Sequence, residues 1–360
     1  MLNYMLVFVP ITALLEFVIH PGDVWIFISA ALAIVPLAGL MGRSTEELAA
    51  RAGSAIGGLL NATFGNATEL IIAFFALQAG KIDVVKASIT GSMIGNLLLV
   101  LGMAIFLGGL KFPVQRFNRQ AASSLASMLV ICTIAFLIPG MFDFTERLNG
   151  IPGGQKVISD GQLSLAVSFV LIALYVLNMV FSLYTHKDML SSADDDAGTH
   201  KAEWTSARAI ATLFACTAVV AWLSEVLVGS LEGFTAALGF SEFFAGLIII
   251  PIIGNAAEHA ASVFARKNKM DLTITIAIGA TIQIALLVAP LLVILSFVIG
   301  KPMDLVIHSP LELMALVGSV SIVGSVARDG ETNWLEGAML LGVYLIMAIA
   351  FFFLPVAMHS

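Results

Sequence analysis

Charged side chains are scarce in this chain. Asp, Glu, Lys and Arg make up 11% of its 360 residues, whereas about 25% is typical of a soluble domain. Hydrophobic residues account for 59%, and the mean hydropathy is +1.00. This balance excludes an ordinary soluble domain. It predicts an all-α polytopic membrane protein, because apolar segments of sufficient length cross a bilayer as helices.

Cysteine is also rare, and two familiar sequence features are missing. Cys132 and Cys216 both fall in apolar stretches, so we interpret them as small buried hydrophobic residues and expect no disulfide framework. The N-terminus shows no basic leader with a small-residue cleavage site, so the first apolar segment is expected to remain as a helix. The sequence contains no His-Glu-x-x-His motif, which argues against a zinc hydrolase.

The apolar runs indicate about eleven transmembrane helices, since a span needs about 20 apolar residues. They are predicted at residues 3–19, 24–42, 45–79, 83–110, 118–139, 160–185, 205–230, 236–267, 271–300, 305–327 and 334–357. Several are longer than a span requires, so they must tilt, bend or project from the bilayer. The third begins amphipathically at Thr45-Glu46-Glu47-Leu48.

Loop charges predict the orientation in the membrane. Of the 17 basic residues, the loops on one side carry only Lys81, Lys86, Arg147, Lys156 and Lys301. The others lie on the side of the N-terminus, and basic residues are enriched in cytoplasmic loops. We therefore expect a cytoplasmic N-terminus and, with an odd number of helices, a C-terminus on the opposite side.

One short signature occurs twice inside apolar stretches. Gly65-Asn66-Ala67-Thr68-Glu69 recurs as Gly254-Asn255-Ala256-Ala257-Glu258, 189 residues later (254 − 65). A carboxylate at membrane depth costs roughly 2.5–3.5 kcal/mol on insertion scales, and such a residue marks a functional site by default. Glu69 and Glu258 are therefore the primary candidate site residues.

The repeat extends beyond the signature and organises the chain. Gly91-Ser92-Met93-Ile94-Gly95-Asn96 precedes one Leu-rich run, and Gly279-Ala280-Thr281-Ile282-Gln283 precedes another. Because the signatures lie on the third and the eighth predicted helices, an odd number of helices apart, the copies run antiparallel, which is an inverted-topology repeat built around a midplane site. We predict an extra helix at 1–22, a first five-helix repeat at 23–185, an acidic cytoplasmic linker at 186–204 and a second repeat at 205–360.

The residue types of the signature suit a hard cation. Gly65 and Gly254 permit a helix break or a close approach, and Pro251 frees a further carbonyl. Asn66 and Asn255 either supply amide oxygens or hold the bend. Carboxylate, amide and carbonyl oxygens together favour Ca²⁺.

Further residues near the signatures are weaker candidates. Ala67, Asn96, Gln283 and His259 could act as secondary ligands or at the helix bends, although the two amides could equally serve helix packing and a single His is more often a structural hydrogen-bond partner. Gating or proton entry is predicted for the acidic residues Glu47, Glu225 and Glu312, although Glu47 and Glu225 could also be merely solvated or snorkelled.

The segment Gly57–Ile71 resembles the first α-repeat of the calcium/proton exchangers in the calcium/cation antiporter superfamily, and Gly254-Asn255-Ala256-Ala257-Glu258-His259 resembles the second. Thr45-Glu46-Glu47-Leu48 and Ser224-Glu225-Val226-Leu227-Val228 also match family patterns. The resemblance covers essentially the whole chain. It implies that Glu69 and Glu258 bind calcium midway across the membrane and that the helix before each repeat helix is a gate. Gly95 and Gly279-Ala280-Thr281 depart from hydroxyl-containing family motifs, so we expect altered secondary ligands or ion preference but no change in the primary acids.

The predicted function is secondary antiport that exports cytoplasmic Ca²⁺ in exchange for H⁺ by alternating access. Sodium-driven or manganese exchange within the superfamily, a passive channel and, remotely, an intramembrane hydrolase using Glu258 and His259 are the alternatives. Ca²⁺ is the transported substrate and H⁺ the counter-ion, with no cofactor. Ca²⁺, H⁺ and the lipid bilayer are the expected partners, and nucleic acid is not. The expected location is a prokaryotic plasma membrane or, alternatively, a vacuolar membrane.

Overall fold

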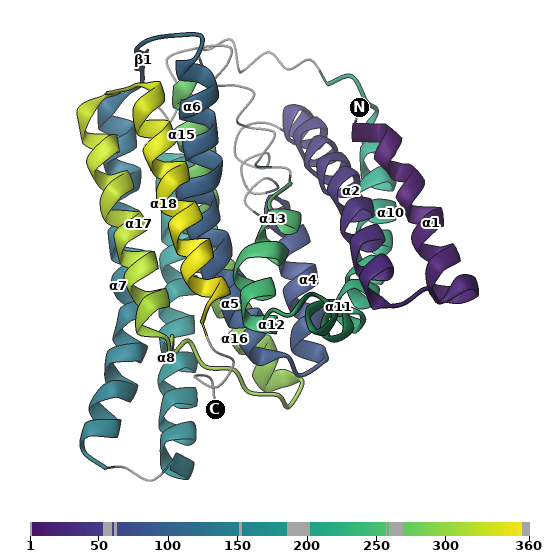
Figure 1. The fold of residues 1–360 in the computed structure, drawn as a ribbon. Helices are drawn as coiled ribbons and strands as arrows, with labels where there is room; N and C mark the ends of the chain where they lie inside the picture. The colour runs from purple at the N-terminus through teal and green to yellow at the C-terminus, as the bar shows by residue number, and fades with distance from the viewer. Residues whose placement is uncertain are drawn as a thin grey trace. The chain divides into compact units, whose positions relative to one another are not determined.

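The computed structural model describes residues 2–52, 60, 63–150, 153–185, 202–256, 258 and 269–354. Apart from two strands of two residues each, the regular structure in these ranges is helical (Figure 1). The chain forms two compact units, each built from two separate stretches: Met1–Ser88 with Phe181–Ala257, and Ile89–Val180 with Glu258–Ser360. The division of the sequence into two repeats around the linker 186–204 stays a prediction, because the two compact units are defined by contacts in space and not by repeated sequence. Most of the linker lies outside the described residues.

The first unit contains the N-terminal helices and the helices that carry or precede the signatures. Its elements are η1 (Leu2–Val7), α1 (Phe8–Leu14), η2 (Leu15–Ile19), α2 (Asp23–Ala52), α4 (Ala67–Gln78), the start of α5 (Ile82–Ile94), η4 (Phe181–Thr185), α10 (Ser206–Gly229), α11 (Leu231–Leu238), α12 (Glu242–Phe244), η6 (Ala245–Ile249) and α13 (Ile250–Gly254).

The second unit contains the remaining long helices. Its elements are the end of α5, η3 (Gly95–Val100), α6 (Leu101–Gly109), β1 (Gln115–Arg116), α7 (Arg119–Leu148), α8 (Gly153–Val180), α15 (Met270–Gln283), η7 (Ile284–Val288), α16 (Ala289–Val298), α17 (Pro310–Asp329), β2 (Glu331–Thr332) and α18 (Trp334–Phe352).

The described residues include eight helices that are long and apolar enough to cross a membrane, or nine if one bent pair counts as a single span. That pair, Leu231–Leu238 with Glu242–Gly254, is bent by 111°. Two shorter apolar helices, Tyr4–Ile19 and Ala67–Gln78, lie outside this count. The all-α membrane architecture is confirmed, while the number eleven stays a prediction.

The predicted boundary between a helix at 24–42 and another starting at 45 is wrong. Helix α2 continues without interruption from Asp23 to Ala52. The polar residues at the expected break stay helical because the hydroxyls of Ser44 and Thr45 donate to the carbonyls of Leu40 and Met41, one turn back. Glu47 therefore lies near the end of α2.

Two other predicted boundaries shift for local reasons. Helix α7 runs past the predicted end at 139 to Leu148, where Arg147 and Asp143 form an (i, i+4) ion pair of 2.8 Å. The helix predicted from 305 begins instead at Pro310. Ser309 caps it by accepting a hydrogen bond from the Glu312 amide, and proline suits the first helical turn.

Helices α2 and α10 pack against each other in the first unit, and α1 packs on α2 (Figure 1). Phe27 of α2 stacks on Phe234 of α11, with ring centroids 3.9 Å apart. Lys81, before α5, forms a 2.8 Å ion pair with Glu242 at the start of α12. These contacts fix the elements that follow and precede the two signatures.

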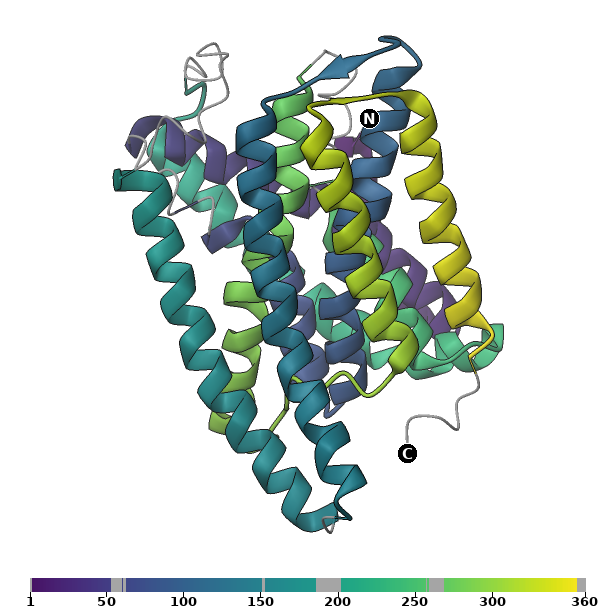
Figure 2. The ribbon, with the colours of Figure 1, turned by 90° about the vertical axis from the view of Figure 1, so that its left-hand side faces the viewer.

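Small residues allow close helix packing in the second unit. A Cβ added to Gly102 of α6 would lie 2.9 Å from Cβ of Leu340 in α18, and one added to Gly109 would lie 2.5 Å from the Trp334 amide nitrogen. Strands β1 and β2 pair antiparallel, with Gln115 opposite Thr332, and join the segments that lead into α7 and α18 (Figure 2).

Candidate cation-binding site

The first signature places a buried carboxylate at a helix start. The chain turns at Gly65 and Asn66, and α4 begins at Ala67 with Asn66 as its N-terminal flanking residue. Glu69 lies in the first turn of α4 with a relative exposure of 9%. The unpaired amides and positive dipole end of a helix favour a negative group in this turn.

The second signature interrupts its helix at the matching residue. Helix α13 ends at Gly254, and Asn255 leaves helical geometry with φ −81° and ψ 19°. The backbone amide of Asn255 donates to the Pro251 carbonyl at 2.9 Å, and its side-chain Nδ2 donates to the same oxygen at 2.8 Å. The asparagine side chain thus holds the bend, which was one of its two predicted roles.

The two signatures meet within the first unit. A Cβ built on Gly254 would lie 3.0 Å from Cγ of Glu69 and 3.7 Å from its Cδ, and α13 packs on α4. Glycine at 254 therefore lets the backbone of one signature lie directly against the carboxylate side chain of the other. Asn66, three residues before Glu69, and Asn255, directly after Gly254, are buried at 3% and 2% exposure.

Glu258 is buried, with 8% exposure, and it begins the second stretch of the second unit. His259 lies outside the described residues. Because Glu69 and Glu258 belong to different units, their pairing around one ion stays a prediction. In the described part of the chain, no three His, Cys, Asp or Glu side chains gather as a metal site.

The secondary candidates Asn96 and Gln283 each lie in or next to a π-helical turn of the second unit. Asn96 lies in the π-helical turn η3, and Gln283 is the last residue of α15, directly before the π-helical turn η7. These turns begin at Gly95 and Ile284, with the same separation as Gly65 and Gly254. Neither polar atom of the fully buried Asn96 side chain finds a hydrogen-bond partner among the described residues. Matched π-turns of this kind are frequent at functional sites.

The three acidic residues predicted for gating lie in different places. Glu312 is buried in the first turn of α17 in the second unit. Glu47 is buried near the end of α2, where its Oε2 accepts a hydrogen bond from the Trp204 amide. Glu225 lies on α10 in a cavity of about 680 Å³.

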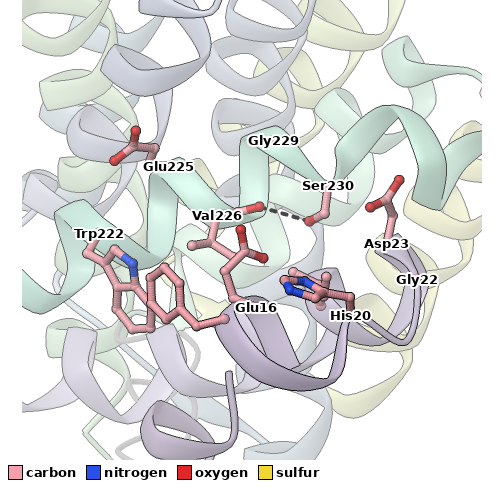
Figure 3. A pocket seen from close by; sticks show the side chains of 11 residues that line it. Glu16, His20, Gly22, Asp23, Trp222, Glu225, Val226, Gly229 and Ser230 are labelled. Carbon is pink, nitrogen blue, oxygen red and sulfur yellow. Dashed lines mark hydrogen bonds between the residues drawn. The ribbon is translucent and has the colours of Figure 1, made fainter. Parts of the chain in front are cut away.

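That cavity is acidic. Besides Glu225 it is lined by Glu16 of η2, by His20 and by Asp23 at the start of α2 (Figure 3). The hydroxyl of Ser230 in its wall donates to the Val226 carbonyl at 2.9 Å. Negative groups concentrate cations and protons in a hollow with low-dielectric walls, so the position of Glu225 suits an entry role.

Several of these residues were absent from the sequence-based predictions. Glu16, His20 and Asp23 looked like ordinary helix ends, and Trp204 followed a polar linker. Arg43 and Arg51 were used only to orient the chain. Their (i, i+4) spacing with Glu47 puts all three on one helix face, but only if α2 is known to continue past residue 42.

A family model described as sodium/calcium exchanger protein matches residues 22–184 and 208–353. This chain belongs to that family. It is thus a membrane exchanger rather than an enzyme, which excludes the intramembrane hydrolase and confirms the resemblance identified from the two signatures.

Individual relatives cover nearly the whole chain. The Ca²⁺/H⁺ antiporter of Aphanothece halophytica is 47% identical over 371 residues, with 98% of this chain and 96% of that protein aligned. The Ca²⁺/H⁺ antiporter ChaA of Bacillus subtilis (strain 168) is 44% identical over 350 residues, or 96% and 97%. The solved structure of native YfkE matches with a TM-score of 0.83 and 40% identity, over 98% of this chain and 100% of that one.

Substituting Gly254 tests the contact between the signatures. Gly254→Ala places a methyl group against the side chain of Glu69, so the carboxylate must shift, and we expect the ion-exchange rate to fall roughly tenfold. Gly318→Ala in α17 is the matched control, because a Cβ there meets nothing within 4 Å. The Ca²⁺ flux into proteoliposomes is measured for both variants. Equal flux in the two variants would contradict a functional role for the contact.

Proposed function

We propose that this protein exports cytoplasmic Ca²⁺ in exchange for H⁺ by alternating access, at a midplane site formed by Glu69, Glu258, Asn66 and Asn255. The observation that carries the proposal is the close approach of Gly254 to Glu69, which joins residues from both copies of the signature. Relatives at 44–47% identity over almost the entire chain are named Ca²⁺/H⁺ antiporters, which supports the choice of ions.

The exchange follows from competition for the same oxygens. Two carboxylates can hold one divalent cation or two protons, so Ca²⁺ displaces protons on one side of the membrane and protons displace Ca²⁺ on the other. One pH unit is worth about 1.4 kcal/mol per proton, so two protons per Ca²⁺ support roughly a hundredfold Ca²⁺ gradient per pH unit. A third proton, on Glu225, Glu312 or His259, would make the exchange electrogenic.

Helices α2 and α10 are the proposed gates. They are the helices that precede the two signature helices, and their packing against each other supports a shared movement. The proposed orientation has a cytoplasmic N-terminus and a C-terminus on the far side, based on the excess of basic residues in the loops of one face. Bacterial and vacuolar relatives are both similar to this chain, and we favour a prokaryotic plasma membrane.

The driving ion is tested by flux in proteoliposomes. An inside-acidic vesicle should take up Ca²⁺ with no sodium present, because the Asn-Ala residues before each Glu lack the hydroxyl-rich character of sodium-binding repeats. Uptake that needs a sodium gradient and ignores pH would establish sodium-driven exchange instead. Uptake without any imposed gradient of H⁺ or Na⁺ would indicate a channel, and competition by Mn²⁺ measures the preference among divalent ions.

Both acids should be indispensable. Glu69→Gln and Glu258→Gln each remove one charge and one titratable group at nearly constant size, so Ca²⁺/H⁺ exchange should fall to background in each variant while Ca²⁺ binding weakens. Ca²⁺/H⁺ exchange is measured in proteoliposomes, and Ca²⁺ binding is measured by isothermal titration calorimetry. Size-exclusion profiles of the two variants verify that they fold. Near wild-type exchange by either variant rules out a two-acid site.

Glu225 should affect the rate rather than binding. Because it lines the acidic cavity and not the signature, Glu225→Gln is expected to slow exchange or shift its pH dependence and to leave Ca²⁺ affinity mostly intact. Glu232→Gln on the exposed side of α11 is the matched control. An unchanged rate and pH profile in Glu225→Gln would remove Glu225 from the mechanism.

A further inference from the structure

The segment that leads into α10 is bound to the end of α2. Arg43, Glu47 and Arg51 follow one another at (i, i+4) spacing on α2, and all three contact residues 202–204. These residues belong to the first unit. The contacts of Trp204 are of two kinds, those of its backbone and those of its ring.

The backbone of Trp204 is held on both sides. Its amide donates to Oε2 of Glu47 at 2.9 Å, and its carbonyl accepts from Nε of Arg51 at 2.8 Å. Glu47 is only 5% exposed, so its carboxylate bond to an amide is a charge-assisted hydrogen bond shielded from water, which is stronger than a neutral one. Glu47 acts here as a hydrogen-bond acceptor, and an acceptor of the same shape could replace it.

The ring of Trp204 is held as well. It is 7% exposed, and the guanidinium carbons of Arg43 and Arg208 lie 4.9 Å and 4.5 Å from its ring centroid. Both distances fall within the range of cation–π attraction. Arg43 also pairs with Glu203 at 2.8 Å, but both side chains are about half exposed or more, so that ion pair contributes little.

Because Trp204 lies just before α10, its contacts connect the start of α10 with the end of α2. Helix α10 starts two residues later, at Ser206, and Thr205 caps it by accepting a hydrogen bond from the Arg208 amide. The start of α10 is thereby joined to the end of α2, the helix on which α10 packs. The acidic cavity lies at the other ends of the same two helices, between Asp23 and Glu225.

We propose that Trp204, held by Arg43, Glu47 and Arg51, is a latch that keeps the two gate helices together during exchange. This inference rests on the proposed function. It assigns Glu47 a positioning role through Trp204 and not a role in carrying protons. The latch therefore needs an acceptor atom at residue 47 and an aromatic ring at residue 204, and it does not need a titratable group.

The test compares conservative with disruptive variants in Ca²⁺/H⁺ flux. Glu47→Gln retains an acceptor oxygen and should keep most of the wild-type rate and its pH profile. Glu47→Ala removes the acceptor from a buried charge-assisted bond and should lower the rate by about tenfold or more. Trp204→Ala should do the same and Trp204→Phe much less, with the Ca²⁺ concentration for half-maximal exchange nearly constant in all four. The controls are Glu46→Ala, next to Glu47 but exposed, and Trp25→Ala, a 62% exposed tryptophan of the same helix.

Amide hydrogen exchange gives a readout independent of transport. Peptides covering residues 202–205 should lose protection in Glu47→Ala and Trp204→Ala and keep it in Glu47→Gln. If the wild type shows no Ca²⁺/H⁺ flux, the proposed function fails, whereas the hydrogen-exchange pattern still tests the latch. Equal loss of flux in Glu47→Gln and Glu47→Ala, or unchanged flux in Trp204→Ala, overturns the latch.

Discussion

The cost of keeping carboxylates inside an apolar protein governs the rest of this structure. A buried charge is tolerated only where opposite charge, hydrogen bonds or oriented dipoles compensate it. Glu69 meets this requirement at the first turn of α4, beside a bend in another helix. The same requirement explains why the signature begins with Gly-Asn. In the second copy, Gly254 allows the approach, and the side chain of Asn255 stabilises the interruption by donating to the Pro251 carbonyl.

Interruptions recur at matched positions, which connects local backbone geometry with the repeat. Helix α13 stops at Gly254 and α4 starts after Asn66, while π-helical turns begin at Gly95 and Ile284. A helix that is regular throughout satisfies its own backbone groups and presents no carbonyls or amides to an ion. Paired interruptions at equal spacing therefore suit the proposed ion path between the two predicted inverted repeats, and each lies in or beside a motif that the sequence repeats.

The sequence was sufficient for the fold class and the family, because the first depends on composition and the second on a motif that occurs twice. It was insufficient where the structure depends on particular side-chain hydrogen bonds, either within a helix or between distant segments. Ser44 and Thr45 looked like a loop, yet they stay helical by bonding back to the preceding turn. The role of Glu47 could not be read from its neighbours either, since its partner Trp204 is far away in the chain and is brought to it only by the packing of α10 on α2.

The two ends of the α2–α10 pair differ in a way that bears on transport. At one end, the backbone and ring of Trp204 are held by three side chains of α2. At the other end, residues of both helices and of η2 line a cavity of about 680 Å³ that contains carboxylates. In the proposed mechanism, such a pair moves as one body and keeps its packed contacts, while water and ions reach the cavity at the other end. Such an arrangement concentrates cations where negative charge and low-dielectric walls coincide, and it leaves the helix faces between the two ends to exclude water.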